Sequence, residues 1–449
     1  MFKKILVANR SEIARRVTRT AKRMGMTVVA VHSEADAGAP FVKEADEAIC
    51  IGPPPPKESY LKVDAIVEAA KESGAEAIHP GYGFLSESPE LAKACEEAGI
   101  AFVGPPVSAV RAMGGKIEAK KTMQAVGVPV VPWYEGPLDD EEGAVKAAEG
   151  IGYPVMLKTS AGGGGIGMYR CDKEKTLRKS FDDAKKKGEM FFGSAALLLE
   201  KYVEKPHHVE VQVLADQHGK TLHLFERECS VQRRHQKLLE ESPSPFLAEE
   251  TRAAMCQAAV KAAETVGYVG AGTVEFVVDS DQNFYFLEMN TRLQVEHPVT
   301  EMRLGIDLVE WQLRIAAGER LTLEQDALTP QGHAIELRIC AEDPDKRFFP
   351  SPGTLGEVRW PEGEGIRVDA GVESQSQVLP FYDSLIGKII GHGQDRDEAI
   401  ARLLAALERT KLEGVVTTVD FHKRVLANDV FRAGRYDTGF IAEVLGLKG

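Results

Sequence analysis

Short apolar runs alternate with amphipathic stretches in the first part of the chain. Residues 4–8 form an apolar run that predicts a strand, and apolar side chains then recur at helical spacing at Ile13, Val17, Ala21 and Met24. Ser11 is predicted to cap this helix and Gly25 to end it. The alternation continues with predicted strands at 27–32, 77–79 and 101–103 and predicted helices at 63–73 and 90–98. Strands that alternate with helices predict a parallel α/β sheet.

The pattern changes in the middle of the chain. A glycine-rich loop at residues 161–167 lies between predicted strands at 154–158 and 168–170, and a charged helix is predicted near 174–187. The later part is richer in strands, with strands predicted at 209–213, 271–278 and 283–290, strand-rich regions at 331–358 and 380–392, and helices at 397–409 and 419–428. The change indicates further structural units behind the first.

The composition is that of a globular protein with an acidic surface. The chain has 449 residues, enough for two to four domain-sized units, and 43% of them are hydrophobic. A formal net charge of −13 repels nucleic acid phosphates and anionic membranes, so neither is expected as a partner. No signal peptide and no apolar stretch of bilayer-spanning length is recognisable, and the six cysteines form no Cys-x-x-Cys pair. These features predict a cytoplasmic protein.

The glycine-rich loop is a candidate phosphate site. Glycines allow backbone N–H groups to approach phosphate oxygens closely, and Lys158 stands at the end of the preceding strand. A flexible surface linker is the alternative, but linkers seldom lie inside a hairpin. Because no Gly-Lys-Ser/Thr closes the loop, it is not a Walker P-loop. We therefore predict a mobile lid over a nucleotide.

Polar side chains follow aromatic ones on the strand at 283–290. Residues of even number share one face of a strand, and here that face is expected to carry Phe284, Phe286, Glu288, Asn290 and Arg292 in order. Glu275 lies on the preceding strand. Two glutamates and an amide oxygen on neighbouring strands provide the hard oxygen ligands that Mg²⁺ prefers. A surface ladder of salt bridges is the alternative, and we predict a magnesium site at Glu275, Glu288 and Asn290.

A second polar segment covers residues 226–237. Cys229 has no recognisable His or Asp partner for nucleophilic catalysis, so a buried or half-buried thiol is the favoured interpretation. His235 alone would indicate a structural histidine, but its neighbours Gln232 and Lys237 favour a role in a binding site.

Two more positions are open between a structural and a functional interpretation. The loop at 79–87 follows a strand of the predicted parallel sheet, where α/β proteins bind ligands, although a structural Pro-Gly turn explains it nearly as well. Arg338 lies on an alternating strand and is either a buried ion-pair partner or an anion binder.

Four segments of the chain are highly specific in combination: Ile5-Leu-Val-Ala-Asn-Arg10, His79-Pro-Gly-Tyr-Gly-Phe-Leu-Ser-Glu87, Gln232-Arg-Arg-His-Gln-Lys237 and Glu288-Met-Asn-Thr-Arg-Leu-Gln-Val-Glu-His-Pro-Val-Thr300. Together they resemble the biotin carboxylase family of ATP-grasp enzymes over essentially the whole chain. The resemblance implies a multidomain fold of α/β and α+β type. Its expected parts are a Rossmann-like parallel domain at 1–114, an ATP-grasp domain at 115–330 with a mobile lid at about 131–203, and a strand-rich C-terminal domain at 331–449.

The resemblance also implies a role for each candidate site residue. ATP is expected to contact Lys116, Lys158, the backbone of Gly164 and Gly165, His208, Gln232 and His235, with Glu200, Lys201, Tyr202 and Val203 as the segment beside the adenine. Mg²⁺ or Mn²⁺ is expected at Glu275, Glu288 and Asn290. Bicarbonate is expected among Lys237, Arg292, Gln294, Val295 and Glu296. Biotin is expected at Arg338 and Tyr82. The catalytic residues implied are Lys237, Arg292, Glu296 and Arg338.

The implied reaction activates bicarbonate, which is a poor electrophile. Glu296 is expected to remove its proton so that an oxygen can attack the γ-phosphorus of ATP, while Lys116 and Lys158 offset the charge of the transferred phosphoryl group. Carboxyphosphate then yields CO₂ and phosphate. Phosphate is expected to take the biotin N1 proton while Arg338 stabilises the ureido anion, which CO₂ then captures.

Several positions depart from the family pattern. Ser11 replaces a usual Gly, Gly115 a usual Asp, Ala161 a usual Gly and Ile166 a usual Arg or Lys. The glycine loop with Ala161 and Ile166 resembles that of urea carboxylases and of second bacterial paralogues. No Met-Lys-Met tripeptide is present, so biotin is not expected to be attached to this chain. Expected partners are a biotin carboxyl carrier protein, carboxyltransferase subunits and a second copy of the chain.

The final carboxyl acceptor is left open by the sequence. Acetyl-CoA or another acyl-CoA is the favoured acceptor, which would connect the chain to malonyl-CoA supply and fatty acid synthesis, and pyruvate or urea is the alternative. Two other classes are a carboxylate–amine ligase of the ATP-grasp type and a silent nucleotide-binding subunit. The first would not need Gln294, Val295, Glu296 or Arg338, and the second would normally lack a metal ligand or a lysine.

Overall fold

The computed structural model describes residues 1–160, 167–443 and 446. Its N-terminal part is a five-stranded sheet in the order β3-β2-β1-β4-β5, and every neighbouring pair is parallel. The strands are β1 (Lys4–Val7), β2 (Thr27–His32), β3 (Glu47–Cys50), β4 (Ala77–His79) and β5 (Ala101–Phe102). The helices of this part are α1 (Ser11–Arg23), α2 (Pro40–Glu44), α3 (Val63–Ser73), α4 (Pro89–Ala98) and α5 (Val107–Gly114), with short 3₁₀ turns η1 (Glu34–Asp36) and η2 (Pro56–Glu58). The predicted parallel α/β sheet is confirmed.

The start of α1 differs from the prediction. Ser11 does not cap the helix, because Arg10 occupies the N-cap position and makes no side-chain capping bond. Ser11 is instead the first helical residue and has a φ of 59°, in the left-handed region that glycine adopts without strain. This backbone conformation is the physical reason why a glycine suits the position.

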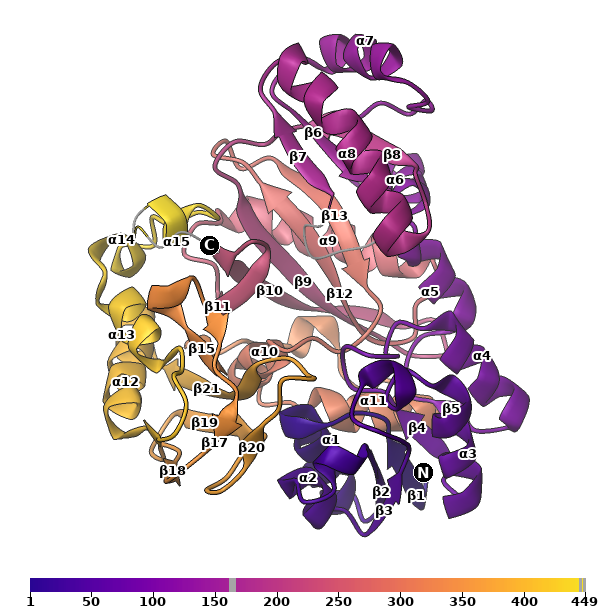
Figure 1. The fold of residues 1–449 in the computed structure, drawn as a ribbon, viewed down its shortest axis with the longest axis vertical. Helices are drawn as coiled ribbons and strands as arrows, with labels where there is room; N and C mark the ends of the chain where they lie inside the picture. The colour runs from indigo at the N-terminus through magenta and orange to yellow at the C-terminus, as the bar shows by residue number, and fades with distance from the viewer. Residues whose placement is uncertain (161–166, 444–445, 447–449) are drawn as a thin grey trace.

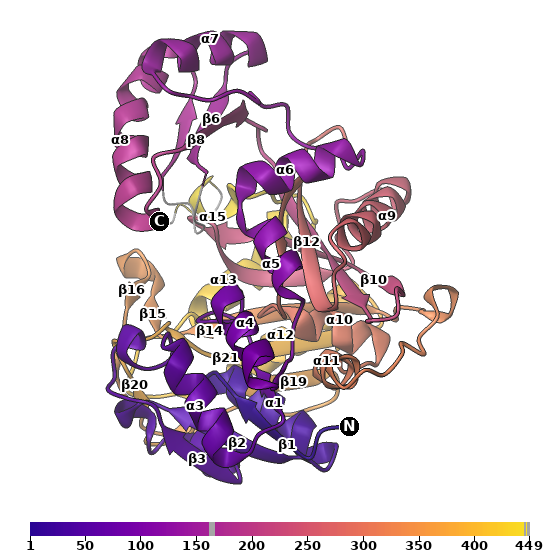
Figure 2. The same ribbon diagram turned by 90° about the vertical axis from the view of Figure 1, so that its right-hand side faces the viewer.

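A small lid stands apart from the body, at the top of Figures 1 and 2. Its sheet has the order β7-β6-β8 and is antiparallel, as the hairpin prediction requires. The elements are α6 (Lys116–Ala125), which leads into it, α7 (Glu141–Ile151), β6 (Val155–Thr159), β7 (Met168–Cys171), α8 (Glu174–Phe192) and β8 (Leu197–Lys201). Apolar side chains of α7, α8 and the three strands form a core of their own.

An eight-stranded sheet forms the body, in the order β13-β12-β9-β10-β11-β14-β21-β19. Its strands are β9 (His207–Ala215), β10 (Thr221–Arg233), β11 (Gln236–Ser242), β12 (Gly270–Val278), β13 (Phe284–Asn290), β14 (His333–Cys340), β19 (Ile366–Ala370) and β21 (Leu385–Gly393). All neighbouring pairs are antiparallel. β11 pairs with β14, with Leu239 opposite Leu337, so the sheet runs without a break across residue 330.

Helices and short strands complete the body. The helices are α9 (Glu249–Thr265), α10 (His297–Leu304), α11 (Leu308–Ala316), α12 (Arg396–Arg409), α13 (Val419–Ala427), α14 (Asp429–Arg432) and α15 (Phe440–Glu443), with 3₁₀ turns η3 (Gln325–Ala327) and η4 (Pro344–Lys346). The short strands are β15 (Glu342–Asp343), β16 (Phe349–Pro350), β17 (Gly353–Thr354), β18 (Val358–Arg359), β20 (Gln377–Val378) and β22 (Lys411–Leu412). No described helix is both long and apolar enough to cross a membrane.

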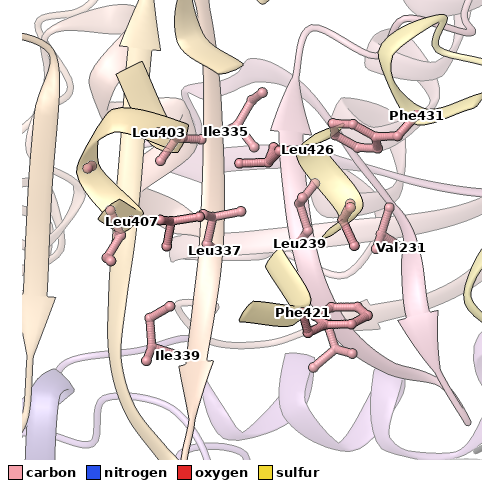
Figure 3. Packing of buried hydrophobic residues seen from close by; sticks show 14 of the residues in the cluster. Val231, Leu239, Ile335, Leu337, Ile339, Leu403, Leu407, Phe421, Leu426 and Phe431 are labelled. Carbon is pink, nitrogen blue, oxygen red and sulfur yellow. The ribbon is translucent and has the colours of Figure 1, made fainter. Parts of the chain in front are cut away.

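The two faces of the sheet near β14 are buried in different ways. Ile335, Leu337 and Ile339 of β14 point into an apolar cluster, where Figure 3 shows Leu337 near Leu403 and Leu407 of α12. Each fully buried side chain of this kind contributes about 1.5–3 kcal/mol to stability. Even-numbered residues such as Glu336 and Arg338 lie on the opposite face, which is polar although it is buried. That face leads to the functional site.

The alternation predicted for β13 is broken at one point. A bulge lies between the pairs Glu275–Glu288 and Phe276–Phe286. The extra residue reverses the facing of the strand, so Phe286 and Met289 both pack into the core while Glu288 points to the other side. The prediction that Phe286 and Glu288 share a face is therefore wrong, because a bulge is set by pairing with the neighbouring strand.

Candidate active site

A cavity of about 920 Å³ is lined by the lid sheet and the eight-stranded sheet. It collects most of the predicted site residues: Lys116, Lys158, Glu200, Lys201, Tyr202, Val203, His208, Gln232, His235, Lys237, Glu275, Glu288, Asn290, Arg292, Gln294, Val295, Glu296 and Arg338. Gly164 and Gly165 lie outside the described residues. Tyr82 is not among the described residues that line the cavity.

Lys237 on β11 donates to three carboxylates at once. Its Nζ lies 2.6 Å from Glu210, 2.8 Å from Glu275 and 2.8 Å from Glu296. Burial by itself lowers the pKa of an ammonium group, but the three carboxylates outweigh it and raise the pKa of Lys237 well above its usual value. The lysine is therefore charged at neutral pH, and an anion that enters the cavity competes with these carboxylates for it.

Glu296 lies between two cations. Its Oε1 accepts a hydrogen bond from Lys237 at 2.8 Å and its Oε2 accepts one from Nη2 of Arg338 at 3.0 Å. Burial raises the pKa of a carboxyl group, yet Lys237, Arg338 and Arg227 together hold the pKa of Glu296 well below its usual range. The carboxylate is thus ionised at neutral pH, which a proton acceptor requires. Arg338 also donates from Nε to Glu240 at 2.7 Å, so it is a buried ion-pair partner that borders the cavity.

A fully buried arginine, Arg227, holds two of the side chains that contact the site residues. Arg227 on β10 is 0% exposed and donates to Glu210 at 2.6 Å and to Gln294 at 2.7 Å. It thereby fixes two side chains that reach Lys237 and Glu275. Arg227 was not among the predicted site residues, although it lies in the dense run of charged residues that begins at Glu226. Cys229 on the same strand is fully buried, which confirms the prediction of a buried thiol.

The predicted metal ligands are adjacent. Glu275 and Glu288 face each other across β12 and β13. Glu275 accepts bonds from Lys237, Asn290, Gln294 and His208. The side chain of Glu288 makes no hydrogen bond or ion pair within the described part of the chain, and burial together with nearby Glu275 raises its pKa. A divalent cation beside the pair would relieve this repulsion, so the two carboxylates fit Mg²⁺. Asn290 directs its amide oxygen to Arg292, at 2.9 Å.

Lysines approach the cavity from the lid side. Lys158 of β6 and Lys120 of α6 both pair with Glu200 of β8. Burial raises the pKa of Glu200 by itself, but the two lysines prevail and lower it to about 2. Lys116 begins α6, one turn before Lys120. The sequence analysis missed Lys120, although a spacing of four residues from Lys116 on a helix was a usable signal.

The loop after β4 touches the site through Glu87. Its carboxylate accepts from Nε of Arg292 and from the backbone N–H of Thr291, each at 3.0 Å. Tyr82 is half-buried instead, with its ring 5.9 Å from Nζ of Lys388. The loop therefore supports Arg292 rather than presenting Tyr82 to the cavity.

Known protein families match the chain in three consecutive parts. The model described as "Biotin carboxylase, N-terminal domain" matches residues 1–110, and "Biotin carboxylase C-terminal domain" matches residues 336–443. Between them, "Carbamoyl-phosphate synthase L chain, ATP binding domain" matches residues 115–324.

Relatives match the chain from end to end. Biotin carboxylase of Halalkalibacterium halodurans is 53% identical over 448 residues, covering 100% of this chain and 99% of the relative. One of the pyruvate carboxylase subunits of Methanothermobacter thermautotrophicus is 51% identical, covering 99% of this chain and 90% of the relative. A solved structure of the Hydrogenobacter thermophilus 2-oxoglutarate carboxylase biotin carboxylase domain dimer, with MgADP, ADP and bicarbonate, superposes with a TM-score of 0.96 at 47% identity, covering 100% of this chain and 98% of that one. The chain belongs to the biotin carboxylase family.

Proposed function

We propose that this chain carboxylates biotin held on a carrier protein, with ATP and bicarbonate as the other substrates and ADP and phosphate as products. One observation carries the proposal: an ionised carboxylate, Glu296, lies between Lys237 and Arg338 in a cavity that also holds the lysines Lys116 and Lys158. Such a site offers a proton acceptor and two anion-binding cations beside a region suited to phosphates. This is the arrangement that activation of bicarbonate requires.

Bicarbonate is proposed to bind between Lys237, Arg292 and the segment from Gln294 to Glu296. An anion there would draw Lys237 away from Glu296, and the weaker ion pair would make that carboxylate a stronger base. Glu296 then takes the bicarbonate proton, and the freed oxygen attacks the γ-phosphorus of ATP. Positioned bases of this kind typically contribute about 10²–10⁴ in rate.

The nucleotide is proposed to occupy the lid side of the cavity. Lys116 and Lys158 offset the charge of the phosphates, while His208, Gln232 and His235 line the same space. Gly164 and Gly165 are proposed to contribute backbone N–H groups. Glu200, Lys201 and Val203 are proposed to border the adenine.

Glu275 and Glu288 would hold Mg²⁺, with Asn290 as the proposed third ligand. When bound, the ion supplies positive charge to the phosphate oxygens of the nucleotide. Within the chain, Lys237 and His208 hold Glu275 in place.

Arg338 is proposed to act after phosphoryl transfer. Its guanidinium borders the cavity and is held by Glu240 and Glu296, so it can face the ureido oxygen of biotin and stabilise the anion formed there. Tyr82 is not proposed to contact biotin, since it is not among the described residues that line the cavity.

The partners proposed are a biotin carboxyl carrier protein and carboxyltransferase subunits. A homodimer is also proposed, in keeping with the dimer named for the Hydrogenobacter thermophilus domain. Acetyl-CoA or another acyl-CoA is the proposed final acceptor, and the Methanothermobacter relative keeps pyruvate as the alternative. Intact mass after co-expression with biotin ligase should show no added biotin, because the Met-Lys-Met context is missing.

ATP cleavage measured with and without bicarbonate and free biotin tests the function. We expect slow cleavage that requires bicarbonate and rises when biotin is added. A carboxylate–amine ligase would ignore biotin and cleave ATP only with its own acceptor. A rate that does not depend on bicarbonate would reject the proposal.

A further inference from the structure

Two glutamates face each other behind Arg338. Glu240 on β11 is directly opposite Glu336 on β14, and both side chains are 0% exposed. Opposed side chains on antiparallel strands have Cβ atoms about 5 Å apart, so the two carboxyl groups are neighbours. Oε2 of Glu240 and both carboxyl oxygens of Glu336 lack a hydrogen-bond partner in the described part of the chain.

The nearby cations are engaged with other groups. Arg338 donates to Oε1 of Glu240 at 2.7 Å and to Oε2 of Glu296 at 3.0 Å. Lys388 on β21 donates to the carbonyl oxygen of Val295 at 2.7 Å, and its ion-pair partner is Glu12, at 3.4 Å. Glu336 therefore has no described ion-pair partner. A carboxylate without a donor in a dry interior is strongly disfavoured, so the group must carry a proton.

We propose that Glu240 and Glu336 share one buried proton, held mainly on Glu336, and that this pair positions Arg338 and sets the charge it presents to biotin. An O–H of Glu336 directed at Oε2 of Glu240 satisfies an orphaned oxygen on each residue. It also leaves a single negative charge on Glu240 for Arg338. The proposal rests on the function proposed above for Arg338.

The electrostatics of the pair agree with a shared proton. Burial and the negative charge of Glu296 raise the pKa of Glu240 to about 7, despite the opposing effect of Arg338. Burial and the negative charges of Glu240 and Glu296 likewise raise the pKa of Glu336 well above its usual value. Two buried carboxyl groups this close cannot both be ionised.

The shared proton matters for the second half of the reaction. When Glu296 accepts the proton of bicarbonate, its bond to Nη2 of Arg338 loses its ionic character, while Glu240 still holds Nε. Arg338 can then turn about this fixed point toward the ureido oxygen with its positive charge available. A second negative charge on the pair would cancel that charge and oppose the anion that forms on biotin.

The charged groups that act on the pair are Lys237 on β11, Arg338 on β14, Lys388 on β21 and Glu296 before α10. His297 on α10 and Glu12 on α1 interact with Lys388. Burial lowers the pKa of His297 far below its usual value, so it stays neutral. Burial raises the pKa of Glu12 to about 7, so Glu12 is the other acid that can titrate here. As the pH rises, loss of the shared proton should lower the rate of biotin carboxylation.

Three glutamine variants test the proposal, each assayed across neutral and alkaline pH for bicarbonate-dependent ATP cleavage without biotin and for carboxybiotin formation with free biotin. Glu240→Gln should lower carboxybiotin formation about 10–100-fold and keep the ATP cleavage, because a charge-assisted bond to Arg338 becomes neutral. Glu336→Gln should keep its rate of carboxybiotin formation at neutral pH and should not show the decline of that rate at alkaline pH, since an amide still donates to Glu240 but cannot ionise. Glu12→Gln, a buried acid that does not contact Arg338, is the matched control and should keep the decline.

Two results would overturn the shared proton. The first is a decline of carboxybiotin formation at alkaline pH that is unchanged in Glu336→Gln. The second is a loss of carboxybiotin formation at neutral pH in Glu336→Gln as large as that in Glu240→Gln, which would mean that Glu336 acts as a carboxylate. Infrared spectra provide a test that does not depend on variant activity: the spectrum of the wild type minus that of Glu336→Gln should contain the C=O band of a protonated carboxyl, to which Glu12 contributes equally in both proteins. A difference spectrum without that band refutes the pair, whereas a wild type without bicarbonate-dependent ATP cleavage refutes the proposed function instead.

Discussion

Replacement of Arg338 by methionine should separate the two halves of the reaction. Methionine keeps most of the side-chain volume but removes the guanidinium that contacts Glu240 and Glu296. Glu296 retains Lys237 at 2.8 Å, so it remains an ionised base. Glu240 loses its cation and can take up a proton, because its pKa already lies near 7. The loss of stability should therefore be about 1–3 kcal/mol, less than the roughly 3–5 kcal/mol typical of a broken buried ion pair.

The expected effect on activity follows from the same contacts. A charge-assisted contact to the ureido anion is worth about 1.5–3 kcal/mol, or about one to two decades in rate. Arg338→Met should lose that much carboxybiotin formation, followed with labelled bicarbonate, and keep its biotin-independent ATP cleavage. Glu296→Ala is the control, and it should lose both activities because no base remains for bicarbonate. If Arg338→Met loses basal ATP cleavage as fully as Glu296→Ala does, Arg338 belongs to the bicarbonate or nucleotide site and the division of roles is wrong.

Three further predictions concern the metal site, the central lysine and the buried acid pair. Glu288→Gln should fold and lose most activity together with tight Mn²⁺ binding, measured by electron paramagnetic resonance, and unchanged metal binding would contradict its assignment as a ligand. Lys237→Met leaves three carboxylates without their shared cation and should cost about 3–5 kcal/mol in the free energy of unfolding, measured with urea; a change below about 1 kcal/mol would show that the cluster relaxes by taking up protons. Glu336→Gln should become more stable than the wild type as the pH rises. The folded-state pKa of Glu336 is raised, so the stability linked to its proton is fully present below the ordinary pKa of glutamate and is lost as the pH rises through the folded pKa. The difference should grow by about 1.4 kcal/mol per pH unit within that window, and thermal melts that differ by a constant amount would argue against it.

The local pattern was sufficient for most of the N-terminal sheet. The predicted strand at 27–32 and helix at 63–73 coincide with β2 and α3. Hydrophobic periodicity is a property of neighbouring residues, so these elements are determined by the segment that forms them. Where the backbone departs from the ordinary pattern, the same reasoning failed. Ser11 has a positive φ, and β13 contains a bulge that is set by its pairing with β12.

The sequence also carried much of the chemistry. Eighteen of the predicted site residues line one cavity, among them Lys116, Glu275 and Arg338. Their motifs lie next to strands in the sequence. When a strand ends at a site, the residues that follow it in the sequence also lie at that site. The residues that were missed act through others: Arg227, Lys120 and Glu240 form ion pairs with residues far away in the chain. The local signals at Arg227 and Lys120 do not reveal which distant residue each one pairs with.

By itself, therefore, the amino-acid sequence determined many of the local elements, the family and most of the polar residues that meet in the cavity. Only the tertiary structure decided that β11 pairs with β14, so that the segments on either side of residue 330 share one sheet. That pairing places Glu336 opposite Glu240 and next to Arg338 on a buried face. The physical reason is that strand pairing and ion pairing act between residues distant in sequence, whereas periodicity and motif spacing record only what lies nearby.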